Sequence, residues 1–99
     1  MSLRLDELSA MLKRLEPRLR EEFHVRSLHV FGSVARGDAG PVSDLDILVE
    51  FDGPRKFAQF MDLKFLLEDE CGVKVDLVAK EALRPALKAR ILAEAKRVA

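Results

Sequence analysis

The residues with the clearest chemical potential are a glycine-serine pair and two aspartates at a fixed distance beyond it. Gly32 and Ser33 are followed, after ten residues, by Asp44 and Asp46 at the head of an apolar run. A third acid, Asp76, lies inside a later apolar segment. Carboxylates bind oxygen-preferring divalent cations, and a glycine turn lets the backbone approach a phosphate closely. The set therefore predicts a magnesium-dependent site for phosphoryl chemistry.

The two aspartates suit a strand that is buried on one face. Side chains alternate along a strand, so Asp44 and Asp46 would share one face, about 6 to 7 Å apart. Like charges at that range raise each other's pKa, and a bound cation removes the penalty. Mg²⁺ is usually held by a few carboxylates plus substrate phosphates. Asp76, from a neighbouring strand, would complete a two-ion site and accept a proton from the attacking hydroxyl.

This set of groups fits nucleotidyl transfer, in which a hydroxyl attacks the α-phosphorus of a nucleoside triphosphate and pyrophosphate departs. Gly32 would admit the phosphates because it carries no Cβ, and Ser33 would offer a hydroxyl and an amide. Arg36, about one helical turn later, would reach the phosphates or the acceptor. Gly32, Ser33 and Arg36 are therefore the predicted nucleotide-binding residues.

Each of these residues also has a structural interpretation. The glycine-serine pair alone can be a turn and a helix cap, and Asp44 can be a cap as well. Asp46 or Asp76 can be a solvated residue of a strand, and Arg36 can form a local salt bridge with Asp38. These separate roles do not explain why two acids face one way in an otherwise apolar strand.

Hydrophobic periodicity predicts the elements that must position the site. In chain order they are a helix over 3–15, an interruption at Pro17, a helical piece over 18–23, a strand ending at Gly32, one or two helical turns over 33–36, a strand over 44–51, a helix over 56–70, a strand over 74–78 and a helix opened by Pro85. The predicted fold class is α/β (α+β), a small mixed sheet of about three strands with helices against it. We expect one domain over 1–99 with an α-β-α-β-α-β-α order.

Two helices carry more specific predictions. In the helix over 56–70 an aromatic stripe is expected to be core or interface, with Gly72 as a left-handed cap after it. The stripe comprises Phe57, Phe60, Met61, Phe65 and Leu66. In the last helix the apolar residues expected to share a side are Leu83, Leu87, Ile91 and Ala95.

Composition narrows the class of protein. Seventeen basic and seventeen acidic residues give a formal net charge of zero, which argues against non-specific nucleic-acid binding. The chain has no run of eighteen apolar residues and no apolar leader segment, so we expect a cytoplasmic protein without a membrane partner. Cys71 is the only cysteine and is expected to be buried. His24 and His29 have no partner at ligand spacing, which favours surface or strand roles.

The quoted residues resemble those of a known family. Its motifs are Phe-Gly-Ser-Val-Ala-Arg-Gly-Asp over 31–38, Ser-Asp-Leu-Asp-Ile-Leu-Val over 43–49 and Val-Asp-Leu-Val over 75–78. Across nearly its whole length the chain resembles the minimal nucleotidyltransferase (MNT) branch of the DNA polymerase beta-type nucleotidyltransferase superfamily. The resemblance implies Gly32 and Ser33 at the triphosphate, with Mg²⁺ on Asp44, Asp46 and Asp76.

The same resemblance implies a biological role. Members of the branch are typically prokaryotic, are encoded beside a HEPN-domain protein and act as the antitoxin of the pair. In that family the MNT protein is associated with transferring AMP from ATP to a tyrosine of the HEPN toxin. Because so short a chain cannot shape an acceptor pocket alone, a partner is expected, in a homo- or hetero-oligomer.

Several alternatives stay open on sequence grounds. The chain can be a non-catalytic antitoxin that neutralises its partner by stoichiometric binding. Nucleotidylation of a small molecule such as an aminoglycoside is a weaker alternative, since those enzymes carry an additional domain. Template-directed polymerase activity is weaker still, since no basic groove is evident.

Overall fold

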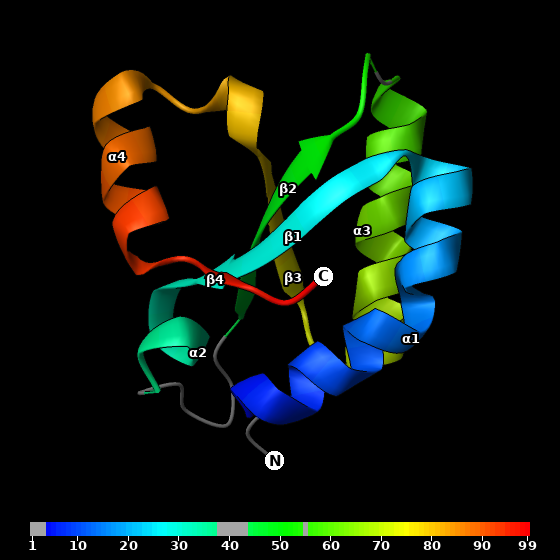
Figure 1. Ribbon diagram of the computed structural model, residues 1–99, viewed down its shortest axis with the longest axis horizontal. Helices are drawn as coiled ribbons and strands as arrows, with labels where there is room; N and C mark the ends of the chain where they lie inside the picture. The colour runs from blue at the N-terminus through cyan, green and yellow to red at the C-terminus, as the bar shows by residue number, and fades with distance from the viewer. Residues whose placement is uncertain (1–3, 38–43, 55) are drawn as a thin grey trace.

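The computed structural model describes residues 4–37, 44–54 and 56–99. Within these residues a four-stranded sheet has α1 and α3 side by side on one side and α4 on the other (Figure 1). The elements are α1 (Leu5–Phe23), β1 (Val25–Phe31), α2 (Gly32–Arg36), β2 (Leu45–Phe51), α3 (Phe57–Cys71), β3 (Val75–Ala79), the 3-10 turn η1 (Lys80–Ala82), α4 (Pro85–Glu94) and β4 (Lys96–Arg97). In the parts of the chain described, no helix is long and apolar enough to cross a bilayer.

The sheet is mixed, with strand order β3-β2-β1-β4. β1 pairs antiparallel with β2 and β4, whereas β2 and β3 run parallel. The mixed α/β class is confirmed, but the prediction of about three strands misses β4. That strand has two residues, both charged, so no hydrophobic alternation marks it. Its neighbour Val98 is buried and donates a backbone hydrogen bond to Leu28, which fixes the end of the chain on β1.

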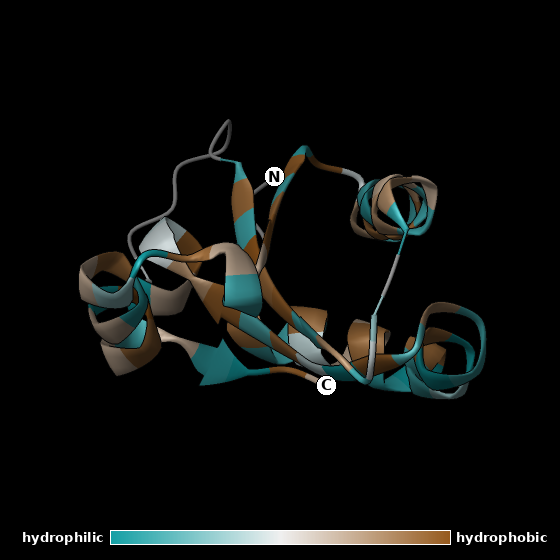
Figure 2. Cartoon of the chain, turned by 90° about the horizontal axis from the view of Figure 1, so that it is seen from above, coloured by the Kyte–Doolittle hydropathy of each residue, from teal (hydrophilic) through white to brown (hydrophobic). Residues whose placement is uncertain are grey.

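The main core lies between the sheet and the pair α1 and α3. Odd-numbered residues of β2 enter this core, so Asp46 and Glu50 are left on the opposite face of the strand. Viewed at right angles, the strands carry alternating hydrophobic and hydrophilic residues between the two groups of helices (Figure 2). The most buried members of the core are Leu8, Leu12, Leu19, Leu28, Val30, Leu45, Ile47, Val49, Leu63, Leu67 and Val98.

Helix α1 runs unbroken through Pro17, so the predicted interruption is wrong. Proline removes one backbone donor and leaves the carbonyl of Lys13 without its usual helical partner. The apolar stripe continues on both sides of the proline, with Leu12 before it and Leu19 after it fully buried, while Pro17 itself is exposed. The packing of this stripe on the core therefore outweighs the loss of the helical hydrogen bond at Pro17.

This arrangement predicts that Pro17→Ala stabilises the protein. Proline inside a helix is about 3 kcal/mol less favourable than alanine, and the stiffer unfolded chain returns up to about 1 kcal/mol. We expect the free energy of unfolding in urea to rise by about 1 to 2 kcal/mol. Glu21→Ala, at another exposed position of α1, is the control and should change it by less than about 0.5 kcal/mol. A variant no more stable than the parent would contradict this explanation.

The outward faces of α3 and α4 also differ from prediction. In α3 the buried residues are Leu63, Leu67 and Cys71, whereas Phe57 and Phe65 are 76% and 56% exposed. A core role for these two phenylalanines is therefore wrong, and an interface role stays a prediction. In α4 Ile91 is buried, but Leu87 is 47% exposed. Both helices are apolar on more than one side, so periodicity alone does not select the face that meets the sheet.

Cap residues and the single cysteine follow prediction. Gly72 ends α3 in the left-handed conformation and donates its N–H to the carbonyl of Glu68. Cys71 is buried, and this burial raises the pKa of its thiol to about 11. His24 is an exposed left-handed cap of α1, while His29 is a half-buried residue of β1. Burial, followed by Arg97 and Lys80, lowers the pKa of His29.

Candidate functional site

The three predicted acids come from two adjacent parallel strands at one end of the sheet. β2 begins at Leu45, so Asp44 lies immediately before the strand and Asp46 is its second residue. Asp46 is paired in register with Asp76 of β3. Neighbouring strands lie about 4.8 Å apart, so these two backbone positions are close. Asp46 is half-buried, and Asp44 and Asp76 are exposed.

The acids interact electrostatically through the charge of Asp46. Burial raises the pKa of this carboxyl, and the charges of Asp76 and Asp44 raise it further. Arg36 acts in the opposite direction, and Glu94 adds a smaller upward contribution. Burial and several neighbouring negative charges thus disfavour the charged form of Asp46, a penalty that a bound cation would relieve.

Gly32, in the turn after β1, lies directly against the Asp46 carboxylate. It has φ +73°, and a Cβ built at this position would lie 2.2 Å from Oδ2 of Asp46. A side chain here would therefore displace the Asp46 carboxylate. Gly32 begins α2, which Ser33 continues as a half-buried residue and Gly37 ends with φ +80°. The helical turns predicted over 33–36 are confirmed. Asp38, the alternative salt-bridge partner of Arg36, lies in 38–43, outside the described residues.

A fourth acid, Glu94, lies at the same turn and was not predicted. Its Oε1 accepts a hydrogen bond of 3.0 Å from the backbone N–H of Gly32. Its Oε2 lies 3.5 Å from Nη1 of Arg36. The two chain segments are 62 residues apart, so no local motif connects them. The only sequence signal is an acid within a largely basic C-terminal segment.

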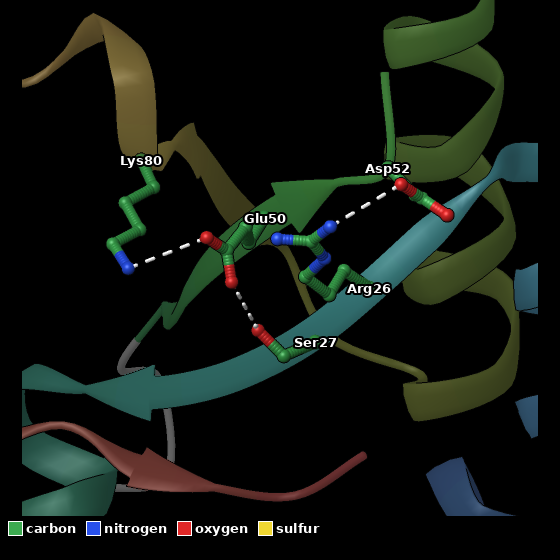
Figure 3. A network of polar contacts seen from close by, with 5 residues as sticks. All are labelled: Arg26, Ser27, Glu50, Asp52 and Lys80. Carbon is green, nitrogen blue, oxygen red and sulfur yellow. Dashed lines mark hydrogen bonds and ion pairs between the residues drawn. The ribbon is translucent and has the colours of Figure 1, made fainter.

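A polar network extends the face that carries Asp46, further along β2. The Ser27 hydroxyl donates to Oε1 of Glu50 at 3.3 Å, and Nζ of Lys80 lies 3.4 Å from Oε2 (Figure 3). Burial alone would raise the pKa of Glu50, but Lys80, Ser27 and Arg26 together hold it below its usual value. This network is also absent from the sequence prediction, because it joins β1, β2 and the turn η1 through residues of ordinary type.

The residues fit a divalent cation in type and register, but their side chains are not gathered around one centre. Among the residues that the structure describes, no three His, Cys, Asp or Glu side chains form a metal-binding group. The donors are all carboxylate oxygens, which are the ligands that Mg²⁺ prefers. Asp44, Asp46 and Asp76 are the side chains that would hold it.

Comparison with known proteins decides the family. The family model described as "Nucleotidyltransferase domain" matches residues 12–98. Protein adenylyltransferase MntA of Thermococcus cleftensis is 40% identical over 92 residues, covering 93% of each chain. The chain belongs to the nucleotidyltransferase domain family. It is a nucleotidyltransferase of the minimal type, as its resemblance implied.

Solved structures agree with this assignment. A structure provisionally named a minimal nucleotidyltransferase shares 38% identity and a TM-score of 0.81, covering 95% of each chain. The MNT antitoxin in complex with the tri-AMPylated HEPN toxin of Shewanella oneidensis is 17% identical, with a TM-score of 0.70. That likeness covers 96% of this nucleotidyltransferase and 71% of the antitoxin chain, and it shows the fold alone.

The raised pKa of Asp46 predicts how this nucleotidyltransferase responds to Asp46→Asn without metal. A folded-state pKa above the ordinary value means that stability falls as pH rises from about 3.8 through the raised value. Asparagine removes that loss, so the variant should be equally or more stable at neutral pH. Because Asp46 is only half-buried, we expect a gain of no more than about 1 kcal/mol.

Urea unfolding in the presence of a chelator measures this difference. The difference in unfolding free energy between variant and parent should develop as the pH rises from about 3.8 through the raised pKa of Asp46, and it should be absent at lower pH. Asp69→Asn, at an exposed position of α3, is the control and should show no such gap. A less stable Asp46→Asn variant at neutral pH would mean that the carboxylate makes net favourable interactions in the folded protein.

Proposed function

We propose that this chain transfers AMP from ATP to a hydroxyl, most specifically a tyrosine, of a HEPN-domain toxin in the cytoplasm, and so acts as an antitoxin. The single observation that carries the proposal is the register of Asp46 with Asp76 beside a glycine turn that has no room for a Cβ. The name of the Thermococcus relative and the AMPylated toxin in the Shewanella complex support the choice of adenylyl group and partner.

In this proposal each residue has a defined role. Asp44, Asp46 and Asp76 would hold two Mg²⁺ ions, which when bound would favour ionisation of the acceptor hydroxyl and neutralise charge on the departing pyrophosphate. The Gly32 amide and Ser33 orient the phosphates, and Arg36 offsets their charge. The acceptor oxygen forms a bond to the α-phosphorus while the bond from that phosphorus to the bridging oxygen of the β-phosphate breaks. Asp76 takes the hydroxyl proton, and pyrophosphate leaves.

The exposure of the acids indicates how the acceptor is supplied. Asp44 and Asp76 are both exposed at the end of the sheet, so none of the residues that the structure describes covers the site on that side. A reaction that must exclude water needs a second wall. In this proposal the partner supplies the wall and presents its hydroxyl group directly to the site.

Labelled nucleotides test the proposal. The chain is incubated with Mg²⁺, a HEPN-domain protein from the same genome and each α-labelled nucleoside triphosphate in turn. We expect label from ATP on the toxin, none from γ-labelled ATP, and none when a chelator is present or when the acceptor tyrosine is phenylalanine. Absence of label from every α-labelled nucleotide, with both proteins folded, would overturn the proposal and favour a non-catalytic binder.

A further inference from the structure

Glu94 uses the same groups that the proposed function assigns to the triphosphate. Its two carboxylate oxygens reach the Gly32 N–H and the Arg36 guanidinium, at 3.0 and 3.5 Å. One negatively charged group with two oxygens, bridging an amide and a guanidinium, reproduces the contacts of a bound phosphate. The similarity is chemical and does not depend on the sequence around either residue.

The fold holds Glu94 in this place from both sides. It is the last residue of α4, a helix that contacts α2 and β1. Two residues later, Lys96 of β4 pairs with Val30 of β1. The backbone of Glu94 is thus fixed between two anchored elements, while its side chain remains about one-third exposed. Only the side chain needs to rotate to free the turn.

We propose that Glu94 occupies the phosphate position of the nucleotide-free enzyme and is displaced when a triphosphate binds. The inference rests on the proposed function, since it requires that the turn binds nucleotide. The Gly32 N–H has one hydrogen, and a phosphate oxygen and the Glu94 oxygen are both acceptors, so they compete for it. Glu94 is therefore an internal competitor at the nucleotide site.

Such competition lowers the affinity of every ligand that must displace Glu94. A ligand that must displace Glu94 binds with an apparent affinity reduced by the fraction of molecules in which the turn is free. Inorganic phosphate can replace only the contacts that Glu94 already makes. A triphosphate brings further oxygens for the cations on the neighbouring aspartates, and so recovers the loss. A triphosphate with its metal ions can therefore still bind tightly, whereas a single phosphate gains little by replacing Glu94.

The test measures binding of a non-hydrolysable ATP analogue and of inorganic triphosphate, each with Mn²⁺, by calorimetry. Glu94→Gln keeps the size of the side chain but removes its charge, so its hydrogen bond to Gly32 weakens and its ion pair with Arg36 is lost. We expect both ligands to bind about three- to tenfold more tightly than to the parent. Glu94→Ala should give at least the same gain. Glu21→Gln, an equal charge change on α1, should leave both affinities unchanged.

Hydrogen exchange provides a readout that a general loss of stability would not reproduce. The Gly32 amide should exchange faster in Glu94→Gln than in the parent, and nucleotide with Mn²⁺ should protect it in both. Affinities equal to or weaker than the parent's in both variants, with folded proteins, would overturn the role of Glu94. Failure of the parent itself to bind nucleotide with Mn²⁺ would instead overturn the proposed function.

Discussion

Gly32→Ala is expected to lower kcat/KM for nucleotidyl transfer by at least about 100-fold, comparable to losing one well-placed donor at a reacting centre. The new Cβ would lie 2.2 Å from Oδ2 of Asp46, so the carboxylate must rotate away from its position. The same change strains the turn, because alanine is unfavourable at φ +73°. One methyl group thus disturbs both the turn proposed to bind phosphate and an acid proposed to bind metal.

Gly72→Ala is the matched control for this variant. Gly72 has a nearly equal φ of +70° at the end of α3, and a Cβ there meets nothing within 4 Å. Both variants should lose about 1 to 2 kcal/mol of stability from backbone strain. Only Gly32→Ala should lose transfer activity, measured as label transferred per minute at saturating Mg²⁺. Equal losses of activity would show that strain, and not the clash with Asp46, is responsible.

The second large effect is expected from the double substitution Asp44→Asn with Asp46→Asn. Loss of the cation ligands removes several kcal/mol of transition-state stabilisation, so activity should fall by at least about 1,000-fold. The metal-free fold should be at least as stable as the parent, because burial and Asp76 both disfavour the charged form of Asp46. Inactivity together with unchanged or greater stability cannot result from misfolding.

The biological outcome of this double variant separates the two classes of antitoxin. If neutralisation of the toxin requires the reaction, the variant should fail to protect cells while still binding its partner. Asp69→Asn, with one exposed acid removed from α3, should protect as well as the parent. Full protection by the double variant would mean that neutralisation is stoichiometric and that the acids are not needed for it.

The predicted site residues come to one end of the sheet because their positions along the strands are determined locally. Alternation along β2 places Asp46 opposite the core, and the parallel register with β3 brings Asp76 to the same level. Glu94 could not be predicted in this way. Its contact with Gly32 depends on where α4 ends relative to α2, and on β4, whose two charged residues have no recognisable strand pattern.

The fold shows the same division between local and tertiary information. The strands around the site are strongly apolar, so their positions could be predicted. Pro17 signals a helix end locally, but Leu12 and Leu19 pack on the same core from both sides of it. In α3 the aromatic residues are the strongest apolar signal, yet Leu63 and Leu67 face the sheet. The face that a helix buries is therefore determined by the elements that pack against it.

Catalytic turnover is the most direct test of the central claim. The claim is that the chain uses the carboxylates beside the glycine turn to catalyse transfer of AMP from ATP to a partner protein. The chain is mixed with a hundredfold excess of HEPN toxin, ATP and Mg²⁺, and the intact mass and activity of the toxin are followed over time. We predict that nearly all of the toxin gains adenylyl groups and loses activity, and that neither occurs without ATP. Neutralisation that stops at one toxin per chain, with no change in toxin mass, would contradict the claim.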